Sequence, residues 1–151
     1  MFEKMLYVRW GDTDANGHMR NTAYLDKSAD VRMMFFAENG FPMDAFAQRR
    51  IGPVIMKDEV DYYREVHILA PLRVTFLLGG LAEDGSRFII RNEFWRVEGD
   101  LAARVTSIGG WLDLAARKLV VPPESLLTAM RTLPHTDDYR DLPSSIKPRG
   151  S

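Results

Sequence analysis

Hydrophobic and polar residues alternate along much of the chain, and this period of two predicts strands. Residues 1–10 fit the period in part, and their Tyr, Val and Trp residues favour a strand over a helix. Alternation is clearer in four later segments, residues 53–66, 71–85, 86–97 and 101–114. Asp84-Gly85 is a typical hairpin turn, so these strands are expected to form an antiparallel meander.

Residues 22–39 instead have hydrophobic positions three and four apart, which predicts one long helix. Asn21 is a suitable N-cap for this helix, and Gly40 stands where a helix C-terminus favours a left-handed residue. A loop is expected over residues 41–52. The aromatic residues of the helix and of the following strands, including Tyr62 and Tyr63, are expected in the core, and a fraction of them could instead line an acyl pocket.

The order of the predicted elements indicates an α+β domain. A strand is followed by a long helix, at least four strands and a short helix after Pro122-Pro123. The long helix is hydrophobic on more than one face, so we expect an antiparallel sheet wrapped around it. This single domain is expected to span residues 1–133. The Pro- and Ser-containing residues 134–151 are expected to be a polar, flexible tail.

Composition limits the range of functions. The chain has 151 residues, of which 46% are hydrophobic and 27% charged, and its formal net charge is -1. These values are typical of a soluble globular protein and predict neither nucleic acid nor an anionic membrane as a partner. The absence of cysteine excludes disulfides, thiolate metal sites and a Cys nucleophile. Charges throughout the first dozen residues argue against a signal peptide, and we expect no membrane span and a cytoplasmic location.

The segment "DTDANG" from Asp12 to Gly17 matches the start of an EF-hand calcium loop. The twelfth position of such a loop carries a bidentate Glu, but here it is Ala23, and the ninth position is the cation Arg20. A predicted strand also stands where an EF-hand has its first helix. None of the three histidines has a helpful metal-ligand spacing. We therefore expect no metal and no cofactor, and we expect Asp12 to cap a turn.

The same segment leads into the N-terminus of the long helix, where backbone N–H groups are unpaired and the helix dipole is positive. Thioester hydrolysis needs a carboxylate that activates water or attacks the carbonyl, together with donors to the developing oxyanion. Asp14 can supply the carboxylate, and the backbone amides near Asn21 can supply the donors. Gly17 has no Cβ and would let the backbone approach a substrate closely.

The sequence "DTDANGHMRNTAY", between a strand and a long helix, resembles that of the hotdog-fold acyl-CoA thioesterases, the 4-hydroxybenzoyl-CoA thioesterase-like superfamily. It also resembles the catalytic stretch of plant acyl-ACP thioesterases. The resemblance implies that Asp14 is the base or nucleophile and that the Asn21 amide polarises the carbonyl. The implied catalytic residues are Asp14, Asn16, His18 and Asn21, and the expected substrate-binding residues are Gly17 and Tyr24. Read without the resemblance, Asn16 is equally an ordinary turn residue and His18 an ordinary loop histidine.

The resemblance further implies a homodimer or homotetramer that acts on an acyl-CoA or acyl-ACP substrate, and an exposed edge strand would favour such pairing. Arg64 is one of several basic residues that could contact the CoA phosphates. Two alternatives remain, a hotdog enoyl-CoA hydratase and a non-catalytic acyl-CoA-binding module. The hydratase motif has its His five residues after the Asp, whereas His18 follows Asp14 by four, and Gly17 replaces the motif's Pro.

Overall fold

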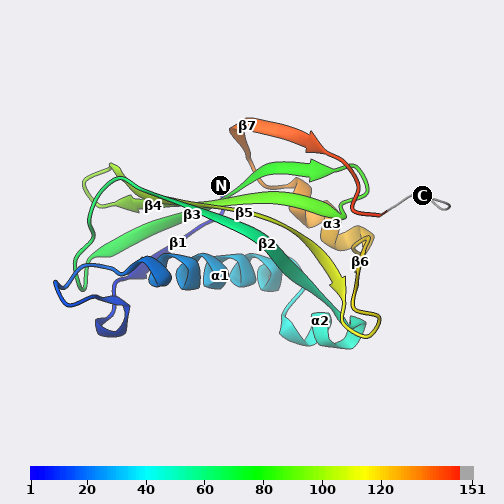
Figure 1. Cartoon of the computed structure of the whole chain (residues 1–151), viewed down its shortest axis with the longest axis horizontal. Coiled ribbons are helices and arrows are strands. Elements are labelled where there is room, and N and C mark those ends of the chain that lie inside the picture. The colour runs from blue at the N-terminus through cyan, green and yellow to red at the C-terminus, as the bar shows by residue number, and fades with distance from the viewer. Residues whose placement is uncertain (147–151) are drawn as a thin grey trace.

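The computed structural model describes residues 1–146. The chain first forms β1 (Glu3–Tyr7), the 3-10 turn η1 (Trp10–Asp12), α1 (Asn21–Glu38), α2 (Met43–Arg49) and β2 (Ile51–Tyr62). It continues with β3 (Pro71–Ala82), β4 (Arg87–Arg96), β5 (Leu101–Asp113), β6 (Lys118–Val120), α3 (Glu124–Arg131) and β7 (His135–Leu142). The predicted α+β fold, with one long helix followed by an antiparallel meander, is confirmed (Figure 1). Among the described residues, no helix combines the length and apolar character that a bilayer crossing requires.

The sheet has the strand order β1-β3-β4-β5-β2, and all neighbours along this path are antiparallel. Its curved face covers α1, which lies beneath the strands in Figure 1. The helix turns one broad face toward the sheet, made of Ala23, Tyr24, Lys27, Ser28, Val31, Arg32, Phe35 and Phe36. Phe35 packs edge to face on Phe76 of β3, with ring centroids 5.2 Å apart. Aromatic contacts of this kind fix the position of the helix on the sheet.

A buried arginine gives α1 a polar attachment to the sheet. Arg32 donates hydrogen bonds to Asn92 Oδ1 and Ser107 Oγ, each at 2.8 Å. Burial lowers the pKa of Arg32 to about 10, although the nearby carboxylate of Asp58 acts in the opposite direction. The guanidinium donates hydrogen bonds in fixed directions, so its partners must lie at defined positions. The hydrogen bonds of Arg32 therefore set the register of α1 against β4 and β5.

The start of α1 differs from the prediction by one residue. Arg20, not Asn21, is the N-cap, and no side chain caps the first turn. Asn21 is the first helical residue, and its Oδ1 accepts a hydrogen bond from the Thr22 N–H at 2.9 Å. Gly40, with φ of +87°, has the left-handed conformation predicted for the end of the helix.

The loop predicted over residues 41–52 contains the helix α2. Its single buried residue, Phe46, stacks on Trp111 with centroids 6.1 Å apart and packs edge to face on Phe36. Seven residues with one buried side chain show no helical periodicity, which explains why the sequence did not reveal this helix.

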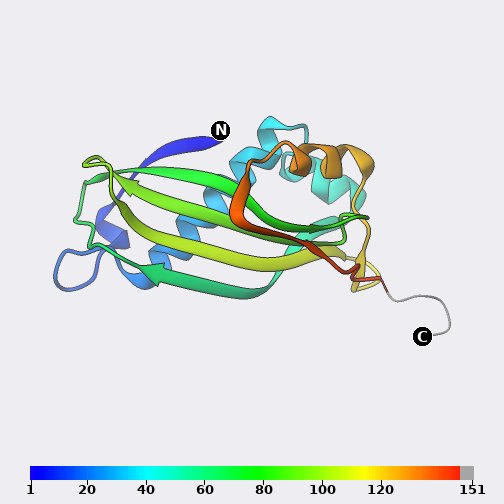
Figure 2. The ribbon, with the colours of Figure 1, turned by 90° about the horizontal axis from the view of Figure 1, so that it is seen from above.

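The segment predicted to be a flexible tail from residue 134 contains strand β7. The five residues of β1 pair with only the first part of β3, residues 71–75, and β7 runs parallel to β3 along residues 78–82 (Figure 2). Thr136 is the only buried residue of β7, so its sequence has no hydrophobic alternation and its pairing depends on backbone hydrogen bonds. Residues 147–151 of the predicted tail lie outside the described residues.

Candidate active site

The residues between η1 and α1 form a tight loop that is closed by its own backbone. Thr13 and Met19 form an antiparallel bridge, and the Asp14 N–H donates to the His18 carbonyl at 2.8 Å. Asp14 Oδ1 accepts the N–H groups of Asn16 at 2.9 Å and of His18 at 3.1 Å. Gly17, with φ of +75°, supplies the left-handed residue that this closure requires. The loop therefore orients the Asp14 carboxylate while leaving the residue exposed to solvent.

A buried ion pair attaches this loop to the helix. Lys27 Nζ of α1 lies 2.8 Å from Asp12 Oδ2, and the two side chains are almost inaccessible to solvent. Burial raises the pKa of Asp12, but hydrogen bonds from Lys27 and Arg9 outweigh it and hold that pKa below 3.8. Asp12 thus has a structural role at the turn, as the sequence predicted.

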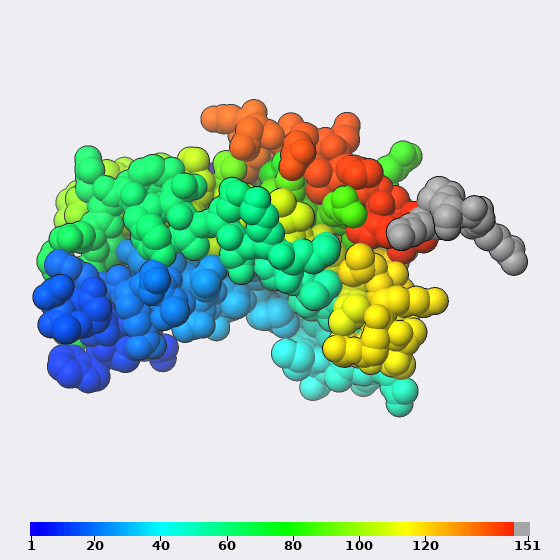
Figure 3. Space-filling view, viewed as in Figure 1, coloured from blue at the N-terminus to red at the C-terminus, as the bar shows by residue number. Residues whose placement is uncertain are grey.

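A second set of contacts attaches the loop to the segment that joins β2 to β3. The Met19 N–H donates to the Val66 carbonyl at 2.7 Å, and the Ile68 N–H donates to the Gly17 carbonyl at 3.1 Å. Residues 17–19 and 66–68 thereby lie side by side although they are far apart in sequence. In Figure 3 the blue surface of the first residues meets the green surface of this later segment at one end of the molecule.

A groove with a volume of about 340 Å³ opens between these two segments. Its lining consists of Asp14, His18, Met19, Tyr24, Tyr62, Tyr63, Arg64 and Glu65. The groove thus contains three of the six predicted site residues, and the other three lie outside its lining, namely Asn16, Gly17 and Asn21. Because a carboxylate and an imidazole both line it, the groove has groups capable of proton transfer.

Tyr24 forms the buried part of the groove. It packs edge to face on Tyr62 and Phe94, with centroid distances of 5.4 Å and 5.2 Å. Burial, together with the neighbouring Tyr62, raises the pKa of Tyr24 to about 12. Its hydroxyl therefore stays protonated at neutral pH and can donate a hydrogen bond.

Of residues 62–65, only Glu65 was not considered for the site from the sequence, and the structure places all four on the groove. Tyr62 and Tyr63, expected in the core, are 54% and 45% exposed and line the groove. Glu65 Oε2 lies 3.4 Å from His18 Nε2. These residues follow the loop by more than forty positions, and only the backbone contacts of the folded chain bring them to it.

The first turn of α1 supplies backbone donors near this groove. The Thr22 N–H is bonded to Asn21 Oδ1, and the Ala23 N–H donates to the Arg20 carbonyl at 3.1 Å. For the Asn21 N–H, the described part of the chain provides no acceptor. This amide, at the positive end of an eighteen-residue helix, is a free donor for an anionic or polarised oxygen.

Comparison with known sequences gives one family. The sequence profile described as the thioesterase-like superfamily matches residues 8–130. No curated protein sequence matches the chain.

Solved structures share the fold at low sequence identity. A hypothetical protein of Staphylococcus aureus in complex with CoA is 19% identical, with a TM-score of 0.79 over 98% of this chain and 89% of that one. A 1,4-dihydroxy-2-naphthoyl-CoA thioesterase from Synechocystis is 18% identical, with a TM-score of 0.77 over 86% and 95%. A probable thioesterase from Escherichia coli is 20% identical, with a TM-score of 0.73 over 88% and 98%. These similarities confirm the predicted hotdog fold.

Proposed function

The chain belongs to the thioesterase-like superfamily and is a thioester hydrolase, and we propose that it cleaves an acyl-CoA with Asp14 as general base or nucleophile. The observation that carries this proposal is the loop of residues 13–19, which presents an exposed carboxylate in a groove beside the N-terminus of α1. Such a site combines the two elements of thioester hydrolysis, an activated nucleophile and donors for the oxyanion.

Asp14 is held in an orientation suited to this role. Two backbone N–H groups, those of Asn16 and His18, bind Oδ1 and fix the direction of the carboxylate. With Oδ1 held by the loop, Oδ2 is the oxygen that acts on water or on the thioester carbon. The Asn21 N–H is the proposed donor to the carbonyl oxygen, and the Tyr24 hydroxyl is a proposed second contact.

His18 and the turn residues have supporting roles in this proposal. His18 lines the same groove as Asp14 and is a candidate to move a proton to the leaving thiolate. Asn16 and Gly17 shape the loop, because one binds Asp14 through its N–H and the other provides the positive φ.

Two observations support CoA as the carrier of the acyl group. The similar protein from Staphylococcus aureus is in complex with CoA, and the similar enzyme from Synechocystis is a CoA thioesterase. Arg64 lies on the groove and is 61% exposed at its side chain, so it is accessible to a phosphate group.

We also propose that the active protein is a homo-oligomer, paired through β2. This twelve-residue strand is the last in the sheet and is mostly exposed, including Ile55 and Met56, which are 37% and 50% exposed. A long edge strand with exposed apolar residues is a site for pairing with a second strand.

The test uses a panel of aliphatic and aromatic acyl-CoAs with a dye that traps the released thiol. We expect Asp14→Asn to lower kcat by about 10² or more, since general-base groups contribute 10²–10⁴-fold. The matched control is Asp44→Asn, an exposed aspartate on α2 outside the groove, which is expected to keep full activity. If the wild-type protein bound acyl-CoAs but released no CoA from any of them, the chain would be a binding module and the proposal would be wrong.

A further inference from the structure

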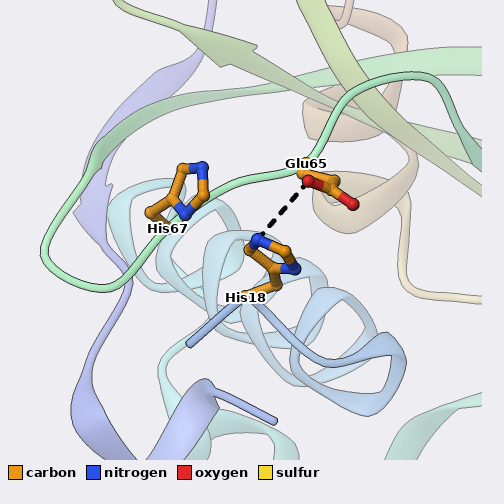
Figure 4. Close-up of side chains that lie close together, drawn as sticks. All are labelled: His18, Glu65 and His67. Carbon is orange, nitrogen blue, oxygen red and sulfur yellow. Dashed lines mark ion pairs between the residues drawn. The ribbon is translucent and has the colours of Figure 1, made fainter. Parts of the chain in front are cut away.

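Two histidines and a glutamate meet at the rim of the groove. The side chains of His18, Glu65 and His67 each offer a ligand atom, and these atoms lie within 4.8 Å of one another (Figure 4). His18 Nε2 is 3.4 Å from Glu65 Oε2, and the two imidazole rings are 4.7 Å apart between centroids. The cluster therefore joins the loop before α1 to the segment after β2.

One distance within this cluster equals the spacing of neighbouring metal ligands. In a tetrahedral zinc site with bonds of about 2.0–2.1 Å, neighbouring ligand atoms are about 3.3 Å apart. The measured 3.4 Å between the His18 nitrogen and the Glu65 oxygen agrees with this value. The ligand atom of His67 lies within 4.8 Å of the other two, and this side chain is exposed and free to rotate toward them.

The backbone fixes this arrangement before any ligand arrives. His18 and His67 are direct partners in an antiparallel bridge, so both side chains leave the same side of the paired segments. The hydrogen bonds of Met19 to Val66 and of Ile68 to Gly17 close the backbone on either side of that bridge. A metal would thus find its two imidazoles already adjacent, with little ordering entropy to overcome.

The chemistry of the ligands narrows the class of metal. Two imidazoles and one carboxylate suit borderline divalent ions such as Zn²⁺, Co²⁺ and Ni²⁺, whereas Ca²⁺ and Mg²⁺ prefer oxygen ligands alone. The adjacent Arg64 does not occupy the Glu65 carboxylate, because its Nε pairs with Asp100 Oδ2 at 3.4 Å. The exposed position of Glu65 and His67 leaves room for a fourth ligand from solvent.

We propose that His18, Glu65 and His67 form a binding site for one divalent transition-metal ion at the rim of the groove. The site shares His18 with the hydrolytic proposal, whereas Glu65 and His67 have no role there. A bound ion engages His18 and places a positive charge next to the groove that contains Asp14.

The test is calorimetric titration of ZnCl₂ into untagged, metal-free protein, without substrate. We expect wild-type protein to bind one equivalent, and His67→Gln and Glu65→Gln to bind at least about tenfold more weakly, a loss of about 1.4 kcal/mol. His135→Gln is the matched control, because His135 is the third histidine and stacks on Tyr139 of β7. It should bind as the wild type does.

Titration with CoCl₂ gives an independent readout, because the visible absorption of Co²⁺ reports nitrogen and oxygen ligands in a tetrahedral field. We expect that spectrum in wild-type protein and its loss in His67→Gln, with circular dichroism confirming that the variant is folded. Glu65 is exposed, so Glu65→Gln tests the site even if a histidine variant is destabilised. Absence of Zn²⁺ binding in the wild type, or equal binding by wild type, His67→Gln and Glu65→Gln, would overturn the proposal. Because CoA release is measured separately, failure of either proposal leaves the other unaffected.

Discussion

The ion pair between Lys27 and Asp12 provides a quantitative test of how the loop of residues 13–19 is held on α1. Lys27 and Asp12 are 5% and 4% exposed, and their charged atoms are 2.8 Å apart. Lys27→Met keeps most of the volume of the side chain but leaves the Asp12 carboxylate buried without its cation. Removing one partner of a buried pair costs about 3–5 kcal/mol.

The expected loss lies near the lower end of this range, because the Arg9 N–H still donates to Asp12 Oδ2 at 2.8 Å. A loss of about 3 kcal/mol in the free energy of unfolding corresponds to about 6–12 °C in Tm for a domain of this size. Urea denaturation at pH 7 measures the first quantity and calorimetry the second. The double variant Asp12→Asn/Lys27→Met should recover part of the loss, which a double-mutant cycle will quantify.

Lys57→Met is the matched control. Lys57 pairs with Glu59 at 3.0 Å, but both side chains are more than half exposed, and such surface pairs contribute about 0–1 kcal/mol.

Low pH gives a further test of the Asp12–Lys27 pair. The pKa of Asp12 is lower in the folded protein than its ordinary 3.8, so the stability that the pair contributes is complete above pH 3.8 and is lost as the pH falls through the lowered value. The difference between wild type and Lys27→Met should therefore narrow in acid. Equal losses for the Lys27 and Lys57 variants at pH 7 would refute the reasoning.

Two further predictions concern the same region. The pKa of Tyr24 is raised to about 12 from 10.0, so its contribution to stability is complete below pH 10 and is lost as the pH rises toward 12. Tyr24→Phe should lose less stability than wild type between pH 10 and 12 in urea titrations, and an identical decline in both proteins would contradict this. Gly17→Ala should cost about 1–2 kcal/mol of unfolding free energy because of its φ of +75°, whereas Gly11→Ala should change it by less than about 0.5 kcal/mol. A Cβ on either glycine would meet no atom within 4 Å, so equal effects of the two variants in urea would show that the positive φ is not the cause.

The elements that the sequence predicted well are those with a long regular period. The helix predicted over 22–39 is α1, and the four predicted strands are β2 to β5. Each is ten residues or longer, so its sequence pattern repeats several times, even in β2, where only Ile51 is buried. The helix α2 and the strand β7 were not predicted, since they have only seven and eight residues and their sequences show no hydrophobic repeat.

The candidate site was predictable only as far as it is local. Asp14, His18 and Tyr24 lie within eleven residues of one another, and their part of the groove could be inferred from the loop and the helix that follows. Glu65 and His67 join them through the bridge between residues 18 and 67, and nothing in the local sequence determines which distant segment pairs with the loop. For the same reason, the spacing of the histidines along the chain did not indicate that His18 and His67 lie close together with Glu65 in the folded protein.

The division of the edge of β3 between β1 and β7 has a consequence for growth of the sheet beyond one chain. β1 runs antiparallel to β3 and β7 parallel to it, so this side of the sheet ends in two short strands of opposite direction. The sequence of β7, "HTDDYRDL", contains three aspartates and an arginine among its eight residues. An incoming strand would find neither a continuous register nor an apolar surface there. The long strand β2 is thus the one side of the described sheet suited to addition, and the homo-oligomer proposed above would close as a pair through this strand without continuing into a filament.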